Sequence, residues 1–199
     1  MNARFDPASA SPSTERTARK ILDAAKACFE HQGIEKTSMV DIATQAGYSR
    51  PIVYKHFANK DEVVDAVCIR EMLAVQAVLD RHIPADLPFA ERLTEVILRA
   101  VLLARDNPYL QRFSEDGTAW ARSQNYSGRV HRWFADRWQA YLARAQNSGM
   151  IAEDVDIERI VGWIALAQSF LLRESDRAPM DEDEMRAFLR RFLIAPLLA

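Results

Sequence analysis

The segment SMVDIATQAGYSRPIVYKHF, from Ser38 to Phe57, decides which fold the chain is expected to have. Its second half reads as a short helix without a carboxylate, in which basic and hydrogen-bonding aromatic side chains stand together: Arg50, Tyr54, Lys55 and His56. Gly47 precedes this helix and can adopt the left-handed conformation that a tight turn requires. Two short helices that cross through such a turn form a helix-turn-helix.

Capping residues mark the ends of the helices around this turn. Ser38, or Thr37 before it, is expected to cap a helix that runs to Ala46, and Asp41 occupies the capping-box position three residues after Ser38. Ser49 is expected to cap the second helix, where Pro51 falls in the first turn and its missing N–H costs little. Asn59 is expected to cap a long helix over residues 60–81. Its inward residues are expected to be Val63, Val64, Val67 and Leu73.

The remainder of the chain also predicts helices, and no stretch shows the alternation of a half-buried strand. The expected helices run from about 15 or 17 to 31, from 90 to 105, from 108 to 115, from 118 to 147 with a possible interruption near Ser127 and Gly128, from 154 or 156 to 174, and from 181 to 198. Residues 1–13 are rich in Ala, Ser and Pro and predict a disordered tail. The fold class is therefore all-α, with about nine helices.

Charge and composition exclude several classes of protein. The net charge is −2, but residues 1–60 carry +3 and the remainder −5, a weak indication of two functions on one chain. Cys28 and Cys68 are expected to be buried or half-buried thiols in a reducing cytoplasm.

The four histidines show no metal-ligand spacing, and the sequence contains no phosphate-binding glycine loop or catalytic constellation. We therefore expect no cofactor, no metal, no catalytic residue and no enzymatic activity. The longest apolar run, residues 162–172, is too short to span a bilayer.

Residues 21–68 resemble the DNA-binding domain of the TetR family of transcriptional regulators. The resemblance is carried by Ala24-Ala25, Phe29 before Gly33, the run from Thr37 to Ile42, Ala46 to Ser49, Tyr54, His56-Phe57 and Asn59 to Glu62. Pro51 and Tyr48 depart from the commonest form, since glycine and valine are frequent at these positions. The resemblance implies a DNA-binding domain over residues 14–68, with an N-terminal three-helix helix-turn-helix, and a helical effector-binding and dimerisation domain over residues 69–199.

The resemblance also implies roles for individual residues. The second helix of the motif would enter the major groove, where Arg50 is a candidate for a bidentate bond to guanine, and Pro51 and Ile52 could touch thymine methyl groups. Lys55 could reach either a base or a phosphate. Phosphate contacts are implied for the other residues given roles: Thr37, Ser38, Tyr54, His56 and Lys60. The predicted DNA-binding residues are Thr37, Ser38, Tyr48, Ser49, Arg50, Pro51, Ile52, Tyr54, Lys55, His56 and Lys60.

The second half of the chain is rich in aromatic residues, which suit the wall of a ligand cavity but equally a core or a dimer interface. The predicted ligand-binding residues are Tyr109, Phe113, Trp120, Trp133, Trp138, Trp163 and Phe170. An apolar or planar effector is favoured, and the net acidity of this half favours cationic or neutral compounds slightly over anions. The apolar runs at 161–172 and 188–198 predict a homodimer through the last two helices.

The expected function is that of a cytoplasmic, homodimeric repressor that binds a palindromic operator in double-stranded DNA and is released by a small, largely apolar or aromatic ligand. Two alternatives remain open. One is a helical small-molecule carrier or enzyme with a vestigial helix-turn-helix. The other is a regulator of the same fold that is controlled by a protein partner or acts as an activator.

Overall fold

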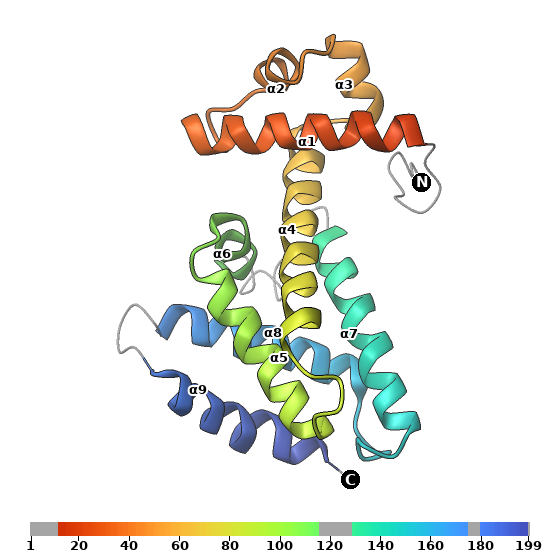
Figure 1. Ribbon diagram of the computed structural model, residues 1–199, viewed down its shortest axis with the longest axis vertical. Helices are drawn as coiled ribbons and strands as arrows, with labels where there is room; N and C mark the ends of the chain where they lie inside the picture. The colour runs from red at the N-terminus through yellow and green to blue at the C-terminus, as the bar shows by residue number, and fades with distance from the viewer. Residues whose placement is uncertain (1–11, 116–128, 175–179, 199) are drawn as a thin grey trace. The chain divides into compact units, whose positions relative to one another are not determined.

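The computed structural model describes residues 12–115, 129–174 and 180–198, and over these ranges the chain is helical with no β-strand, which confirms the predicted all-α class (Figure 1). The chain divides between Ile69 and Arg70 into two compact units, Met1–Ile69 and Arg70–Ala199. We call these the N-terminal unit and the helical unit. The division falls inside helix α4 (Lys60–His82), so both units contain part of this helix.

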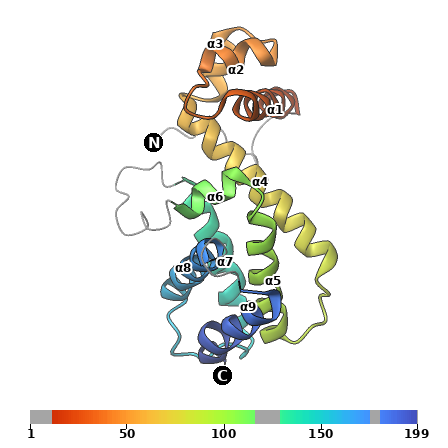
Figure 2. The same cartoon turned by 90° about the vertical axis from the view of Figure 1, so that its left-hand side faces the viewer.

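The N-terminal unit packs α1 (Pro12–Gln32), α2 (Met39–Ala46), α3 (Arg50–His56) and the first turns of α4 around a small core, and Figure 2 shows α1, α2 and α3 lying against one another. Helix α1 begins at Pro12, earlier than expected, so residues 12 and 13 belong to a helix and not to the predicted tail. Residues 1–11 lie outside the described ranges. Fully buried side chains come from each of the four helices: Ile21, Ala25, Ile42, Val53, Phe57, Val63 and Val67.

Local chemistry produces the turn between α2 and α3. The hydroxyl of Ser38 accepts a hydrogen bond from the Asp41 N–H, and the Asp41 carboxylate accepts one from the Ser38 N–H at 2.8 Å, which completes the predicted capping box. Gly47 ends α2 with φ +69°, and the Tyr48 N–H donates to the Ala43 carbonyl at 3.0 Å. Ser49 precedes α3 as expected, but its hydroxyl makes no capping bond.

The helical unit consists of the rest of α4 together with α5 (Phe89–Ala104), α6 (Pro108–Glu115), α7 (Arg129–Asn147), α8 (Ile157–Glu174) and α9 (Glu182–Leu189). Helices α7 and α5 each pack against α8, and α5 also packs against α9 (Figures 1 and 2). Their shared core consists of aliphatic side chains and methionine: Leu93, Ile97, Leu98, Val101, Leu142, Val161, Ile164, Leu171, Met185 and Leu189. The prediction that Leu73 of α4 points inward is wrong, because its side chain is 44% exposed.

The C-terminal segment differs from the single helix predicted for residues 181–198. Helix α9 begins with a capping box between Asp181 and Glu184, but it is followed by a π-helical turn (Arg190–Ile194) and a 3₁₀ turn (Ala195–Leu197). Pro196 explains the change, because a proline has no N–H to continue the α-helical bonding and its ring clashes with the preceding turn. The end is held by the Ala152 N–H, which donates to the Leu197 carbonyl at 3.0 Å.

Candidate nucleic-acid interface and ligand cavity

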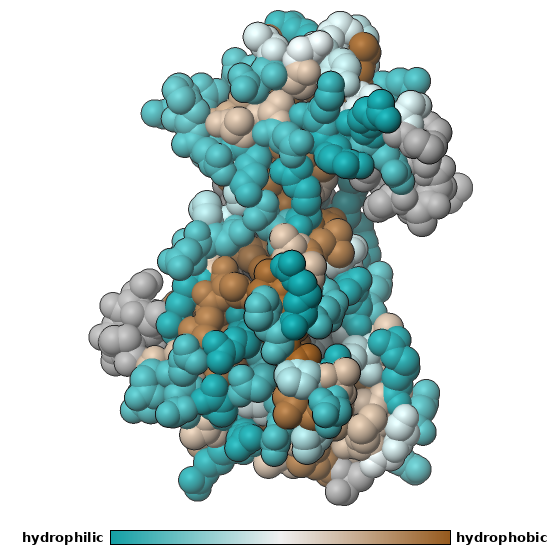
Figure 3. Space-filling model, in the orientation of Figure 1, coloured by the Kyte–Doolittle hydropathy of each residue, from teal (hydrophilic) through white to brown (hydrophobic). Residues whose placement is uncertain are grey.

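Helix α3 is attached to the N-terminal unit by one apolar side and presents the other to solvent. The Val53 side chain and that of Phe57, just after the helix, are fully buried, whereas Ile52 and Tyr54 are 39% and 44% exposed. Arg50, Pro51 and Lys55 are also exposed. With two basic residues and no carboxylate over Arg50–His56, this surface suits the phosphates and base edges of duplex DNA. In Figure 3 the visible surface over α3 and α2 mixes hydrophilic groups with groups of intermediate hydropathy and one strongly hydrophobic group.

His56 does not share this exposed surface. Its side chain is only 8% exposed, and its ring lies 6.5 Å from that of Phe57. Burial, and then the charge of Lys55, lower the pKa of His56 below its ordinary value, so the ring is held neutral near pH 7. His56, one of the predicted DNA-binding residues, is therefore not exposed beside Arg50, because the helix turns this position towards the core.

Thr37 is also placed differently from the prediction. It is buried, and its hydroxyl donates to the Gly33 carbonyl at 2.8 Å, so its side chain stabilises the end of α1 instead of facing a phosphate. Ser38 is exposed but is held by its capping box, and Tyr48 is half-buried. Ser49 lies exposed at the start of α3.

Lys60 has a structural role that the sequence did not indicate. Its ammonium donates to the carbonyls of Ile34 at 3.0 Å and Glu35 at 3.1 Å, which connects the start of α4 to the loop after α1. Two of the three donor hydrogens are therefore occupied within the N-terminal unit. A phosphate contact by Lys60 would have to use the remaining one.

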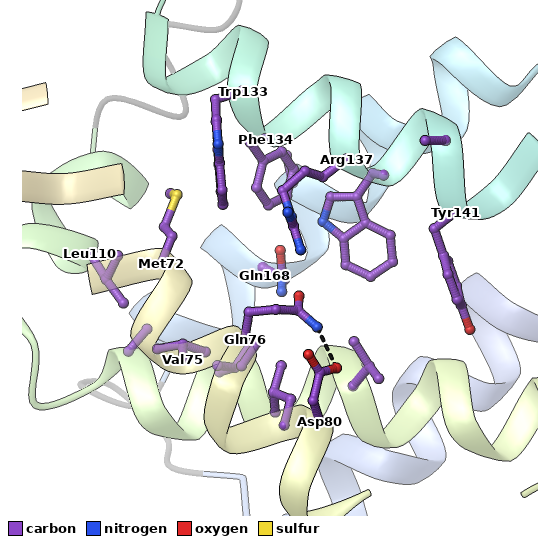
Figure 4. A pocket seen from close by; sticks show the side chains of 18 of the residues that line it. Met72, Val75, Gln76, Asp80, Leu110, Trp133, Phe134, Arg137, Tyr141 and Gln168 are labelled. Carbon is purple, nitrogen blue, oxygen red and sulfur yellow. Dashed lines mark hydrogen bonds between the residues drawn. The ribbon is translucent and has the colours of Figure 1, made fainter. Parts of the chain in front are cut away.

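The helical unit contains a cavity of about 700 Å³ between α4, α5, α7 and α8, with Leu110 of α6 also in its wall. Its aromatic side comes from one helix, α7, which contributes Trp133, Phe134, Trp138 and Tyr141 (Figure 4). The ring centroids of Phe134 and Trp138 lie 6.1 Å apart, and Trp138 meets Tyr141 edge-on at 6.1 Å. Of the seven predicted ligand-binding residues, Trp133 and Trp138 lie in this wall.

The other predicted ligand-binding residues lie elsewhere. Trp163 and Phe170 are 53% and 43% exposed on the outer side of α8, whose inner side is formed by Ile164, Ala165 and Gln168, so these two residues do not line this cavity. Tyr109 is buried but does not belong to the cavity wall. The side chain of Phe113 and all of Trp120 lie outside the described residues.

The polar residues of the cavity were missed entirely, because no local motif identifies them. Gln76 donates from Nε2 to Asp80 Oδ1 at 2.7 Å, and Figure 4 shows Arg137 pointing from α7 into the cavity. The Arg137 guanidinium lies 5.1 Å from the centre of the Trp133 ring. Burial raises the pKa of Tyr141, and the nearby charges of Arg92 and Arg144 oppose that rise. The cavity is thus aromatic on one side but also distinctly basic.

An exposed apolar face runs along α8 and the C-terminal segment. Trp163, Leu166 and Phe170 are each more than 40% exposed, and Phe192 is 57% exposed. Phe188 connects the two segments, with ring centroids 5.5 Å from Phe170 and 5.2 Å from Phe192. Hydrophobic side chains also reach the surface of the helical unit in the view of Figure 3. Large contiguous apolar surfaces of this kind mark sites of protein association.

Metal-binding clusters and membrane-spanning helices are both lacking over the described ranges. Within them, no three His, Cys, Asp or Glu side chains gather in a way that could hold a metal ion. None of the helices in the same ranges combines the length and the apolar character needed to cross a membrane.

Comparison with known proteins places the chain in a family. Residues 21–67 match the family model for bacterial regulatory proteins of the tetR family. The HTH-type transcriptional regulator SrpR of Pseudomonas putida is 31% identical over 155 residues, covering 74% of this chain and 70% of that protein. The uncharacterized HTH-type transcriptional regulator TtgW, also of Pseudomonas putida, is 36% identical over 101 residues, covering 51% of this chain and 72% of that protein.

Solved structures agree with this placement. SmeT, the repressor of the Stenotrophomonas maltophilia multidrug efflux pump SmeDEF, superposes with a TM-score of 0.59 at 26% identity, covering 94% of this chain and 92% of SmeT. A SmeT–triclosan complex gives 0.57 at 25% identity, covering 92% of each chain. These relatives are regulators of transcription. The helix-turn-helix, the helical unit and the extent of the match together show that this chain belongs to the TetR family of transcriptional regulators.

Proposed function

We propose that the protein is a homodimeric repressor in the cytoplasm that binds a palindromic operator and is released by a small aromatic ligand. The observation that carries this proposal is the exposed face of α3, where Arg50, Tyr54 and Lys55 are held outward by the buried Val53 and Phe57. A basic and aromatic surface on a rigidly anchored helix is suited to the major groove.

Arg50 stands at the start of α3 and is the residue best placed to read a base, through two parallel hydrogen bonds to guanine. Pro51 and Ile52 supply apolar contact for thymine methyl groups. Tyr54, Lys55, Ser38, Ser49 and Tyr48 contact phosphates around these bases. His56, Thr37 and Lys60 act as positioning residues, because their polar atoms are buried or bonded within the N-terminal unit.

A second copy of the chain is the partner that the apolar face of α8 and the C-terminal segment requires. Pairing Trp163, Phe170 and Phe192 with their copies would bury side chains that are about half exposed in one protomer. Two copies related by a two-fold axis would form a four-helix interface. Such a dimer presents two α3 helices, which bind one duplex only if they stand about 34–36 Å apart.

Control of operator binding by a ligand is supported by the cavity and by the position of α4 in its wall. The volume of about 700 Å³ lies within the range of small-molecule sites, which is roughly 300–1,000 Å³. Helix α4 supplies Met72, Val75 and Gln76 to the cavity, while its first turns carry the buried Val63 and Val67 of the N-terminal unit. A ligand that moves α4 therefore changes the separation of the two α3 helices. The relative SmeT, a repressor that was also solved with triclosan, supports a repressor with an aromatic ligand.

An electrophoretic mobility shift with the DNA that flanks the coding sequence tests the proposal. We expect a retarded complex that contains two protomers and is competed by the specific duplex but not by an unrelated duplex of equal length. Absence of any complex at modest salt, with a folded dimer in hand, contradicts the proposal and favours a carrier or enzyme with a vestigial helix-turn-helix.

A promoter fused to a reporter gene separates the remaining alternative. Repression predicts that deletion of the gene raises reporter expression and that an aromatic ligand does the same. An activator predicts a fall in expression on deletion. A regulator controlled by a protein partner predicts that no small molecule alters operator binding by the purified dimer.

A further inference from the structure

The wall of the cavity holds more positive than negative charge. Among the residues that the structure describes, three arginines line it, namely Arg92 of α5 and Arg137 and Arg144 of α7, whereas one carboxylate, that of Asp80 on α4, lies in the wall. We propose that the ligand of this cavity is a planar aromatic acid, whose anionic group binds Arg92 and Arg144 and whose rings lie against the aromatic side of α7. This inference rests on the proposed function, in which the cavity is the effector site.

Arg92 provides the strongest evidence for an acidic ligand. Its Nε is fully buried and has no hydrogen-bond partner within the described part of the chain. A buried donor without a partner costs free energy, and that cost is recovered when a ligand supplies an acceptor. A carboxylate is the acceptor that fits best, because a guanidinium can bind its two oxygens through parallel N–H groups.

Arg92 and Arg144 lie at the same end of the cavity. Both are close enough to Tyr141 to affect the pKa of its phenol, and Arg144 follows Tyr141 by three residues on the same side of α7. Two guanidinium groups, one on α5 and one on α7, thus lie near one phenol O–H in the cavity wall. Such a group of donors fixes the position of a carboxylate and rejects an ammonium, because a cation would meet two like charges.

Asp80 does not neutralise this end. Its Oδ1 already accepts the hydrogen bond from Gln76 Nε2 at 2.7 Å, and the residue is exposed. No ion pair joins Asp80 to any of the three arginines over the residues that the structure describes. Within the described part of the chain, the positive charge of the cavity wall is therefore not balanced by an ion pair with Asp80.

Arg137 and the rings of α7 define the shape of the ligand. The Arg137 guanidinium lies over the Trp133 ring at 5.1 Å, and Figure 4 shows Trp133, Phe134 and the Arg137 side chain facing the interior of the cavity. Flat surfaces of this kind stack on aromatic rings. The cavity thus combines a planar, polarisable side with an anion-binding end.

Matched pairs of aromatic acids and their neutral amides test the charge directly. The probes are naphthalene-2-carboxylate with naphthalene-2-carboxamide, and anthracene-2-carboxylate with anthracene-2-carboxamide. Binding to the full-length dimer is measured by titration calorimetry and by quenching of tryptophan fluorescence, which Trp133 and Trp138 report from the cavity wall. We expect at least one acid to bind about tenfold or more tightly than its amide, because hydrogen bonds to an ionised group are roughly twice as strong as neutral ones.

Three arginine variants test which side chains cause the preference for the acid over its amide. Arg92→Met and Arg144→Met are each expected to remove most of the preference for the acid while amide binding stays within about twofold. Arg159→Met is the matched control, because its side chain is 87% exposed near the start of α8 and pairs with Asp156 outside the cavity. It is expected to preserve the full preference. Thermal melting followed by circular dichroism verifies that each variant is folded. If one of the two cavity variants fails to fold, the other still tests the inference.

The outcomes for the ligand and for the repressor can be distinguished. The inference is overturned if no acid binds, if each amide binds as tightly as its acid, or if the preference for the acid survives in both cavity variants. If the amides release operator DNA as well as the acids do, the repressor proposal stands and the acidic ligand is rejected. If acids bind selectively but the protein binds no operator, the ligand inference stands and the repressor proposal fails.

Discussion

Helices α3 and α7 carry the same combination of side chains, arginine beside aromatic rings, but present them to different surroundings. On α3, Arg50 and Tyr54 face solvent, while on α7, Trp133 and Arg137 face a cavity. The difference lies in what surrounds each helix, since α3 packs through a single side and α7 adjoins both α8 and the cavity wall. In the function that we propose, the same chemistry serves as a surface for a large polyanion in one unit and as a lining for a small molecule in the other.

The largest effect is expected from removing the Phe57 side chain, because this buried ring holds α3 against the N-terminal unit. Replacing Phe57 by Ala leaves a cavity in the core of the N-terminal unit and is expected to lower its free energy of unfolding by about 3–5 kcal/mol. Operator binding should be lost, while ligand binding in the helical unit persists. Denaturation followed by circular dichroism, with ligand titration on the same sample, measures both. If Phe57→Ala abolished operator binding and ligand binding alike, the helical unit would depend on the core of the N-terminal unit, contrary to this prediction.

The next effect concerns the apolar face of the helical unit. Phe192→Glu places a charge among side chains that we propose to pair across the dimer, and it should weaken dimerisation by about 2–4 kcal/mol. Light scattering after size-exclusion chromatography measures the change. Leu103→Glu is the matched control, because Leu103 is 38% exposed on α5 and does not belong to that face. A Phe192→Glu protein that remains dimeric at low micromolar concentration would reject the proposed interface.

A smaller effect separates base reading from phosphate contact on α3. Arg50→Ala is expected to cost about 1–3 kcal/mol of specific binding and to relax selectivity at one base position. Lys55→Ala should instead weaken binding to all duplexes alike and reduce the dependence on salt by about one unit of log–log slope. Binding to a set of operator variants at several salt concentrations distinguishes the two. Uniform weakening by Arg50→Ala would reassign Arg50 as a phosphate contact.

The smallest effect follows from the burial of His56. Because the pKa of His56 is lowered in the folded protein, the unfolded chain binds the proton first as the pH falls through about 6.5. Stability of the N-terminal unit should therefore fall below this pH and be fully present above it. Urea denaturation at about pH 7.5 and pH 5.5 measures this for the native protein and for His56→Gln. The variant retains the other three histidines, so an unchanged pH dependence would show that His56 does not titrate as described.

The predictions from sequence succeeded where the signal is local. The capping box at Ser38 and Asp41, the left-handed Gly47 and the bounds of α2, α3 and α6 follow from residues within a few positions of one another. They were less successful where one helix must be oriented against several others. Trp163 and Trp138 look alike as sequence, yet one lies on the surface and the other lines the cavity, because α8 and α7 turn different sides towards the interior.

The sequence by itself determined the all-α class, the helix-turn-helix and the resemblance to the TetR family, because short-range hydrogen bonding and steric rules fix capping residues and tight turns. Only the tertiary structure decided that Lys60 and Thr37 bind backbone carbonyls and that His56 is buried. It also brought Arg92 and Arg144 to one end of a cavity, in a half of the chain whose net charge is negative. Composition sums charge over a whole segment, whereas a ligand meets only the few charges that packing places in the wall of its site.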